Sequence, residues 1–499
     1  MATTSLSAVR VSPSGFGKSE WAIERGAGHA RWHERLYTRL QGQAYPLTIF
    51  EDGIVPAASL WSGARRWVAA FRENGLETGD RLVIALPASP AFIQVLIAGI
   101  WEGLTLAFLP PADDIGNAMT QLDARAGVAL KRDVTAVWTP ELCCGPVEGR
   151  LPLRAALGPP TPDARFLLRT SGTTGMPHWV ALSDDNLFAV LDSHRLRLRL
   201  EKARLLSVLP WHHAFGLVIE LLSALLAGAE IVCDPSHGRD PNHIAQLARE
   251  HASTHLFCVP LTIQKIAQLP DGESLLRGLG GVIGGAPVSA LLADLLAETR
   301  FQVGYGQTEA SPGIALGEPG LWMPSTLGRP VGCRVRLSAD SVLEFSGMNA
   351  CLGLWTERGL ERLDADRWVR TGDLAAQRGQ DFVFLGRADD CFKLSNGRAI
   401  EAGRWEGRLR DAFPELQDAL LYTPDGDTLA VGLLLDATAT QPGQEALRAA
   451  MCMLGSRLTA VGALRRESCR FTPKGELDRA ATRRLLQTVE EQTPGCVST

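Results

Sequence analysis

The sequence predicts an α/β protein with a large N-terminal domain of mixed strand–helix units, a small β-rich subdomain within it, and a small mobile C-terminal α/β lid domain. Two observations predict this fold class. The 499 residues, of which 45% are hydrophobic and 21% charged, suffice for a large buried core and more than one domain. From Leu47 onward, apolar runs typical of strands alternate with apolar runs of helical length, as in βαβ units. Ligands of such folds gather at the carboxyl ends of the strands.

The first strand and helix signals follow each other at short intervals. They indicate a helix at Pro56–Asn74, a strand at Arg81–Leu86, a helix at Pro90–Glu102 and a strand at Thr105–Leu109. The alternation continues through further segments, which are Leu205–Leu209, Gly216–Leu226, Glu230–Cys233, His243–Glu250, Thr254–Val259, Val282–Ile283, Val288–Glu298 and Phe301–Tyr305. We therefore expect mixed sheets covered by helices.

The pattern changes between about Gly328 and Leu385, where short alternating runs predict the β-rich subdomain. These runs are Cys333–Leu337, Val342–Phe345, Arg367–Arg370 and Asp381–Leu385. The polar segment GRADD at Gly386–Asp390 is typical of a junction about which domains rotate. We predict an N-terminal domain of residues 1–385 and a C-terminal lid of residues 386–499.

Composition argues against several classes of partner. The net charge is −5 and the sequence contains no block of basic residues, so nucleic acid and anionic membrane surfaces are not expected partners. The ten cysteines lack the paired spacing of a zinc site or a disulfide framework, which fits a reducing cytoplasm. Residues 1–30 show no secretory signal, and glutamates interrupt the longest apolar stretches, Phe92–Leu109 and Phe215–Val232. We expect a cytoplasmic protein without a membrane span.

The segment Leu167–Val180, LLRTSGTTGMPHWV, is an apolar strand that runs into a turn of hydroxyls and glycines. Such a turn holds phosphate, because its glycines permit left-handed conformations that direct successive N–H groups at one anion. The residues expected to bind are Ser171, Gly172, Thr173, Thr174 and Gly175. A P-loop ATPase is excluded, because Gly-Lys-Ser/Thr does not follow Gly172 after four spacer residues. An ordinary surface turn has the same composition.

The string TSGTTG resembles the phosphate loop of the adenylate-forming superfamily, which includes acyl-CoA synthetases, aryl-acid ligases, peptide-synthetase adenylation domains and beetle luciferases. His178 stands where that loop usually carries a lysine. The motifs GGAP, YGQTE, TGD and GRxDD follow once each in the order of the family, which makes the resemblance specific. Leu47–Pro111 also resembles the opening subdomain of the family, so the resemblance covers most of the chain.

The resemblance implies that VGYGQTEAS, Val303–Ser311, binds ATP and Mg²⁺. By this resemblance Tyr305, which forms a turn with Gly306, stacks on adenine. Thr308 contacts the α-phosphate, and Glu309 holds the metal. The chemistry requires such groups, because a carboxylate that attacks the α-phosphorus of ATP is repelled by its charge. A strand-to-helix cap is the structural alternative for this turn.

Two more motifs complete the nucleotide site that the resemblance implies. GGAP, with Gly284, Gly285 and Ala286, resembles the segment whose backbone lines the adenine and acyl sites, since small residues permit close approach. The spacing of the glycines here does not match the GxGxxG of dinucleotide-binding folds. In RTGDL, Asp373 corresponds to the residue that accepts hydrogen bonds from both ribose hydroxyls, and Arg387 is its companion donor.

LPWHHAFGL at Leu209–Leu217 resembles the acyl-pocket motif, with His213 where acyl- and aryl-CoA ligases commonly carry a histidine. Peptide-synthetase domains instead place an aspartate near the position of Phe215, and none occurs here, which favours a plain carboxylic acid. The aromatic residues of this motif, which are Trp211, His212, His213 and Phe215, are of the kind that stack on a flat aromatic acid.

The C-terminal part departs from the family. FTPKGELDR at Phe471–Arg479 resembles the closing signature, whose lysine bridges the acid carboxylate and the α-phosphate, but Glu476 occupies that place. Lys474 is the nearby cation that we expect to substitute for it. After adenylation the lid is expected to turn about Asp389 and to bring Gly397 and its neighbours to the site.

The resemblance therefore implies a ligase that activates a carboxylic acid with ATP and Mg²⁺ and transfers the acyl group to a phosphopantetheine thiol. The expected thiol belongs to CoA or to an acyl carrier protein. We favour an aromatic, hydroxybenzoate-like acid, as in ligases that prime aryl-polyene pigment assembly. A fatty acyl-CoA synthetase, an oxygen-using luciferase and a degenerate nucleotide-binding pseudoenzyme remain alternatives.

Overall fold

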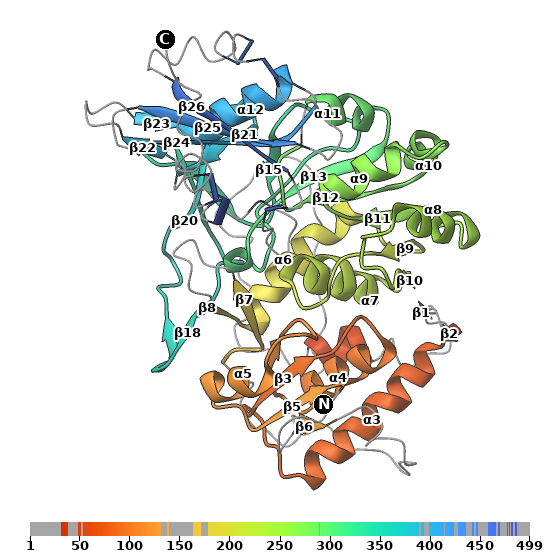
Figure 1. Cartoon of the computed structure of the whole chain (residues 1–499). Coiled ribbons are helices and arrows are strands. Elements are labelled where there is room, and N and C mark those ends of the chain that lie inside the picture. The colour runs from red at the N-terminus through yellow and green to blue at the C-terminus, as the bar shows by residue number, and fades with distance from the viewer. Residues whose placement is uncertain are drawn as a thin grey trace.

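Two large mixed β-sheets organise most of the described chain (Figure 1). The computed structural model describes residues 31–37, 48–50, 53–130, 137–138, 163–170, 178–288, 290–388, 391–393, 399–413, 415–423, 428–435, 442–443, 446–447, 458–465, 468–469, 477, 479, 481–482 and 485–486. Within these residues helices and strands alternate and helices cover the sheets, as the sequence predicts.

Among the described residues, the first sheet has eight strands in the order β19-β18-β8-β7-β4-β3-β5-β6. Their bounds are β3 (Arg81–Ala85), β4 (Thr105–Phe108), β5 (Ala126–Ala129), β6 (Val137–Trp138), β7 (Phe166–Thr170), β8 (His178–Leu182), β18 (Gly353–Thr356) and β19 (Gly359–Arg362). The strands from β7 to β6 pair in parallel, and β8, β18 and β19 add antiparallel pairs. The central strands β3 and β4 are buried almost throughout, as is usual for apolar strands of parallel sheets.

In the part of the chain that the structure describes, the second sheet has thirteen strands in the order β16-β17-β20-β21-β15-β14-β13-β12-β11-β9-β10-β1-β2. Their bounds are β1 (Thr48–Phe50), β2 (Gly53–Val55), β9 (Arg204–Ser207), β10 (Glu230–Cys233), β11 (His255–Phe257), β12 (Gly280–Gly284), β13 (Arg300–Tyr305), β14 (Ala315–Leu316), β15 (Thr326–Pro330), β16 (Arg334–Leu337), β17 (Val342–Ser346), β20 (Val369–Arg378) and β21 (Asp381–Arg387). Neighbouring strands pair in parallel along the part of this sheet that runs from β1 through β10, β9, β11 and β12 to β13.

The β-rich strands predicted after Gly328 form the antiparallel end of this second sheet. The strands β16, β17, β20 and β21 are connected to the parallel part of the sheet by β15 and β14. The strands β18 and β19 join the first sheet instead. The run predicted at Arg367–Arg370 is the start of the longer strand β20. Alternation of buried and exposed residues identifies a half-buried strand, but it does not identify the neighbour with which that strand pairs.

Helices connect the strands. Their bounds are η1 (His33–Tyr37), α3 (Ala57–Glu73), α4 (Pro90–Trp101), α5 (Ile115–Leu122), α6 (Asp184–Leu198), η4 (Phe215–Leu222), α7 (Ser223–Ala227), α8 (Pro241–Glu250), α9 (Pro260–Ala267), α10 (Gly272–Gly278), α11 (Ala290–Ala297) and η5 (Thr308–Ala310). The elements predicted from Pro56 to Tyr305 are confirmed to within two residues at each end. The predicted segment Gly216–Leu226 is a helix that begins with π-type hydrogen bonding in η4. None of the described helices has the length and hydropathy needed to cross a membrane.

Helix starts carry the capping residues that their sequences indicate. Ser89 accepts a hydrogen bond from the backbone N–H of Phe92 at the start of α4, where Pro90 occupies the first helical position. Ser183 and Asn186 form a reciprocal capping box at the start of α6. These local contacts account for the sharp helix starts in this part of the chain.

A smaller C-terminal α/β domain follows the second sheet and lies at one end of the molecule (Figure 1). Its described elements are β22 (Cys391–Lys393), β23 (Ala399–Glu401), α12 (Ala402–Ala412), β24 (Leu416–Tyr422), β25 (Leu429–Leu435) and β26 (Leu458–Arg465). The buried carboxylate of Glu406 accepts two hydrogen bonds of 2.7 and 2.8 Å from the guanidinium of Arg479, which joins α12 to the C-terminal segment. The boundary between residues 385 and 386 stays a prediction.

A buried ion pair connects the first sheet to helix α6. Arg165, directly before β7, is 0% exposed and donates two hydrogen bonds of 2.8 and 2.9 Å to the carboxylate of Asp184. The indole of Trp32 donates a third hydrogen bond of 2.7 Å to Asp184, and the carbonyl oxygen of Leu104 accepts one of 3.1 Å from Arg165. Asp184 is the first residue of α6, where the helix dipole also favours a negative charge.

We expect Asp184→Ala to lower the free energy of unfolding by about 3–5 kcal/mol, because it leaves the buried guanidinium of Arg165 without its counter-charge. Glu201→Ala is the control, since Glu201 is about half exposed and its ion pair with Arg195 lies at the surface. That change is expected to cost about 1 kcal/mol or less. Urea unfolding of the three proteins measures both effects, and equal costs for the two variants would contradict the expectation.

Candidate active site

Three residues predicted to bind the nucleotide lie together although they are distant in the sequence. Tyr305 Oη donates a hydrogen bond of 2.6 Å to Asp373 Oδ2, and Arg387 Nη1 donates one of 2.7 Å to Asp373 Oδ1. Both oxygens of the carboxylate therefore have a protein donor. Burial, followed by the charge of Asp373, raises the pKa of Tyr305, so the phenol keeps its proton and remains a donor.

Strand pairing explains why Asp373 and Arg387 meet. They are direct partners in the antiparallel pair of β20 and β21, so their side chains lie on the same face. Gly372 has a left-handed φ of +77°, which glycine adopts without steric cost. Thr371 Oγ1 accepts a hydrogen bond of 3.1 Å from the backbone N–H of Asp373. This local turn directs the carboxylate toward Tyr305 at the end of β13.

The turn after β13 is held by close backbone contacts. A Cβ atom on Gly306 would lie 1.5 Å from the carbonyl oxygen of Pro312, so a side chain does not fit there. The short helix η5 follows and carries Thr308 and Glu309, both partly exposed. The backbone N–H of Cys351 donates a hydrogen bond of 2.7 Å to the carbonyl oxygen of Glu309. The turn therefore presents two candidate phosphate and metal ligands from a fixed backbone.

Glu309 faces His178 across the two sheets. Glu309 Oε1 lies 3.7 Å from His178 Nε2, and the same ring nitrogen lies 3.1 Å from Thr170 Oγ1. Thr170 and His178 are paired residues of β7 and β8, the strands that flank the predicted phosphate loop. The partly exposed carboxylate of Glu309 is an oxygen ligand of the kind that Mg²⁺ prefers, so this residue fits the metal that the family implies.

The predicted acid-pocket segment divides into a buried and an accessible part. Trp211 is 1% exposed, and its ring packs 5.4 Å from that of Phe92. The expectation that Trp211 stacks on the acid is therefore wrong, because the indole fills the core. His212, His213 and Phe215 remain partly exposed, and the two imidazole centroids are 4.3 Å apart. Burial, and next the neighbouring charge of His213, lower the pKa of His212 to about 3, so His212 is neutral.

The GGAP motif lies between the nucleotide and acid residues. Gly284, the last residue of β12, pairs with Gly304 of β13, and a Cβ atom on Gly284 would lie 2.6 Å from the carbonyl oxygen of Gly304. The Cε1 atom of Phe215 is 3.5 Å from the same Cβ position. Gly285 is exposed and Ala286 partly exposed, so the segment presents mainly backbone. The candidate site thus lies at the carboxyl ends of β9, β12 and β13, the edge that the sequence predicts.

Other predicted site residues lie outside the described residues and their roles stay predictions. These residues are Ser171, Gly172, Thr173, Thr174, Gly175, Asp389, Gly397, Lys474 and Glu476.

Three polar side chains at this edge are not among the residues that the sequence predicts. Thr371 supports the Asp373 backbone, Thr170 contacts His178, and Glu220 is buried in η4 next to the acid segment. Thr371 and Thr170 are the first residues of the motifs TGD and TSGTTG, which is a usable signal. Glu220 could have been found from a different feature of the sequence, because it is a charged residue within an apolar helical run.

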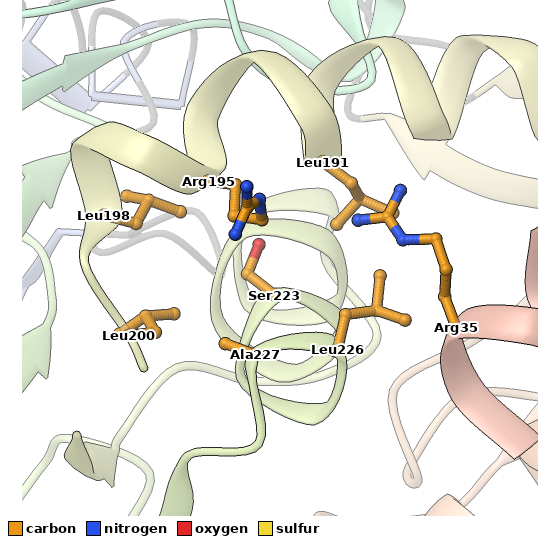
Figure 2. Close-up of a pocket in the computed structure, with 8 residues that line it drawn as sticks. All are labelled: Arg35, Leu191, Arg195, Leu198, Leu200, Ser223, Leu226 and Ala227. Atoms are coloured by element: carbon orange, nitrogen blue, oxygen red, sulfur yellow. The ribbon is translucent and has the colours of Figure 1, made fainter. Parts of the chain in front are cut away.

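The small apolar pocket between α6 and α7 is not part of this site (Figure 2). Its lining residues are Arg35, Leu191, Arg195, Leu198, Leu200, Ser223, Leu226 and Ala227. The two arginines at its rim already contact carboxylates, Arg35 that of Asp192 and Arg195 that of Glu201. The pocket therefore reflects the packing of the helices.

Comparison with known proteins places this geometry in a family. Residues 47–344 match the family model of the AMP-binding enzymes. A feruloyl-CoA synthase of Amycolatopsis sp. is 28% identical over 403 residues, which cover 74% of this chain and 80% of that protein. A sulfoacetate–CoA ligase of Cupriavidus necator is 27% identical over 442 residues, 79% of this chain and 83% of that protein.

A solved structure supports the same fold. ATP-bound MatB from Rhodopseudomonas palustris superposes with a TM-score of 0.76 at 20% identity, over 94% of this chain and 99% of that chain. The family model covers more than half of the present chain. This protein therefore belongs to the AMP-binding enzymes, the family of adenylate-forming acid–thiol ligases.

Proposed function

We propose that this protein activates an aromatic, hydroxybenzoate-like acid as its acyl-adenylate and transfers the acyl group to the phosphopantetheine thiol of an acyl carrier protein or of CoA. The carboxylate of Asp373, held between Tyr305 and Arg387, is the observation that carries the proposal. Each oxygen of a carboxylate has more than one acceptor site, so both remain able to accept from the hydroxyls of a ribose. The phenol ring of Tyr305 is then positioned beside the base.

The first step joins the acid to AMP. An oxygen of the acid carboxylate attacks the α-phosphorus of ATP, the bond from that phosphorus to the pyrophosphate oxygen breaks, and pyrophosphate leaves. Thr308 donates to the α-phosphate and Glu309 would hold Mg²⁺, which offsets charge on the phosphates. Lys474 supplies the cation between the acid carboxylate and the α-phosphate. The position of Glu309 next to His178 and the motif of η5 support the roles of Thr308 and Glu309, and the closing signature of the sequence supports that of Lys474.

The second step transfers the acyl group. The thiol sulfur attacks the carbonyl carbon of the adenylate, the bond to the AMP oxygen breaks, and the thiol proton passes to solvent. AMP is a better leaving group than hydroxide, which makes this attack feasible. We propose that residues 386–499 act as the lid, that the lid turns about Asp389, and that Gly397 and its neighbours then line the thiol channel.

Two observations support an aromatic acid. Phe215 is partly exposed and adjoins Gly284 of GGAP, and His213 of the same segment is also partly exposed. The absence of an aspartate near Phe215 in the sequence favours a plain carboxylic acid over an amino acid. The relative named for feruloyl-CoA points in the same direction. The relative named for sulfoacetate keeps small acids among the candidates. We further propose a cytoplasmic location and a role in aryl-polyene pigment assembly.

A nucleotide-binding protein without ligase activity is the second candidate. It is favoured by His178 and Glu476 at positions where the family carries lysines. Acid-dependent pyrophosphate exchange with aryl, short-chain and long-chain acids separates the candidates, followed by mass measurement of a carrier protein and detection of CoA thioesters. Exchange with an aryl acid supports the proposal, and exchange with fatty acids alone identifies a fatty acyl-CoA synthetase. ATP binding without exchange for any acid identifies the second candidate.

We expect Asp373→Ala and Glu309→Gln each to reduce pyrophosphate exchange by roughly 30- to 1,000-fold, which corresponds to about 2–4 kcal/mol of lost interaction with the nucleotide and its metal. Asp340→Ala and Glu361→Gln are the matched controls, because both carboxylates are exposed, Asp340 between β16 and β17 and Glu361 on the terminal strand β19 of the first sheet. Both controls are expected to keep parental exchange. Parental rates in both site variants would show that the nucleotide-site assignment is wrong.

We expect His213→Ala to change the preference between an aryl and an aliphatic acid by roughly tenfold while the KM for ATP stays unchanged, because the imidazole lines the acid side of the site. His251→Ala, at the end of α8, is the control. The kcat/KM values for each acid and for ATP provide the measurement. A uniform loss for every acid together with a higher KM for ATP would instead assign His213 to the nucleotide side.

A further inference from the structure

A buried glutamate connects helix η4 to the loop that carries His213. Glu220 is 0% exposed and lies in the otherwise apolar helical segment FGLVIELL. Ser207 Oγ, at the end of β9, donates a hydrogen bond of 2.5 Å to Glu220 Oε1. Trp211 Nε1, within the loop, donates one of 3.1 Å to the same Ser207 Oγ. The series from Trp211 through Ser207 to Glu220 therefore links the loop to the helix that follows it.

The helix also touches this loop at its other end. A Cβ atom on Gly216 would lie 2.4 Å from the carbonyl oxygen of Pro210, so η4 packs directly on the loop backbone. Phe215, the first residue of η4, adjoins Gly284 of the GGAP motif. A shift of η4 relative to β9 therefore moves both the loop and the wall next to GGAP. The hydrogen bond from Ser207 at the end of β9 to Glu220 fixes the position of η4 relative to this strand.

The surroundings of Glu220 keep its carboxyl group neutral. Burial raises the pKa of Glu220 to about 8, although the side chains of Ser207 and Trp211 and the backbone of Val208 and Leu209 act in the opposite direction. Cys233 at the end of β10 and Cys258 after β11 face it, and burial raises the pKa of both thiols well above the ordinary value. The charge of Asp234 further raises the pKa of the Cys233 thiol, so this neighbour of Glu220 is neutral.

An apolar residue of similar size would cost less to bury than this carboxyl group. Glu220 Oε2 is buried, and the backbone of Val208 and Leu209 lies beside the carboxyl group. Residues that lower stability in this way are expected at functional sites. Glu220 lies next to the acid segment, where its neutral form matters because a substrate carboxylate binds only where the surrounding protein groups do not repel it.

We propose that Glu220 is a positioning residue for the acid substrate, because its carboxyl group, through Ser207 and Trp211, fixes the loop that carries His213. The proposal rests on the proposed function, in which that loop lines the acid pocket. Glu220 itself does not touch the acid. Its effect is therefore expected in the KM for the acid and not in the KM for ATP, since the hydrogen bonds that Tyr305 and Arg387 donate to Asp373 do not involve η4.

The proposal predicts a pH dependence with a defined direction. At pH 7 Glu220 is protonated and neutral, and it loses its proton as the pH rises through about 8. The ionised form places a negative charge in the apolar region behind the acid pocket and weakens binding of a carboxylate. The KM for the acid is therefore expected to rise above pH 8 in the parental protein. Glu220→Gln keeps an acceptor for Ser207 and cannot ionise, so its KM is expected to stay level there.

The experiment measures pyrophosphate exchange of the full chain from pH 6.5 to 9.5 in the parental protein, Glu220→Gln, Glu220→Leu and Ser207→Ala. At pH 7 we expect Glu220→Gln to keep the parental KM for the acid. Glu220→Leu and Ser207→Ala are expected to raise that KM roughly tenfold, the effect of one lost buried hydrogen bond, and to leave the KM for ATP unchanged. Equal changes in both KM values, or a rise above pH 8 that persists in Glu220→Gln, would overturn the proposal.

A second measurement does not depend on activity. The fluorescence of Trp211, obtained as the difference between each protein and its Trp211→Phe counterpart, is expected to change near pH 8 in the parental protein and not in Glu220→Gln. No change in the parental protein would refute the link between Glu220 and the loop, including in the case that Glu220→Leu does not fold. A fluorescence change in a protein inactive with every acid would instead refute the proposed function and the positioning role and leave the link itself supported.

Discussion

The carboxylate of Asp373 joins the parallel and antiparallel parts of the second sheet. Tyr305 ends β13, the last strand of the parallel part, while Asp373 and Arg387 belong to the antiparallel pair β20 and β21. Removal of the carboxylate leaves a largely buried phenol and a guanidinium without their shared acceptor, which costs more than the hydrogen bonds themselves contribute. The carboxylate therefore helps to fix the end of β13, from which the turn with Thr308 and Glu309 begins.

Buried charged and polar groups elsewhere in the chain also mark connections between elements. The pair of Arg165 and Asp184 joins β7 to α6, and the pair of Glu406 and Arg479 joins α12 to the C-terminal segment. Both pairs satisfy their charges with two direct hydrogen bonds, as burial requires. Glu220 differs, because its hydrogen bond comes from the neutral hydroxyl of Ser207 and burial favours the neutral carboxyl group. Its burial is consistent with a role in fixing geometry.

His178 stands where the phosphate loop of the family usually carries a lysine. A lysine carries its charge at all physiological pH values, whereas an imidazole is a weaker base, and the ring of His178 lies next to Glu309. The neighbourhood of His178, Thr170 and Glu309 is therefore less positive than a lysine in the same place would make it.

By itself the sequence determined the α/β class, many of the helices and strands between Pro56 and Tyr305, and the motifs of the candidate site. Periodicity and motifs are properties of neighbouring residues, which is why the sequence shows them. Only the tertiary structure decided that the β-rich strands continue the second sheet, since alternation does not specify a pairing partner. It also placed Trp211 in the core and Glu220 beside Ser207. Such contacts depend on strand order and on how η4 packs against β9, which no local pattern encodes.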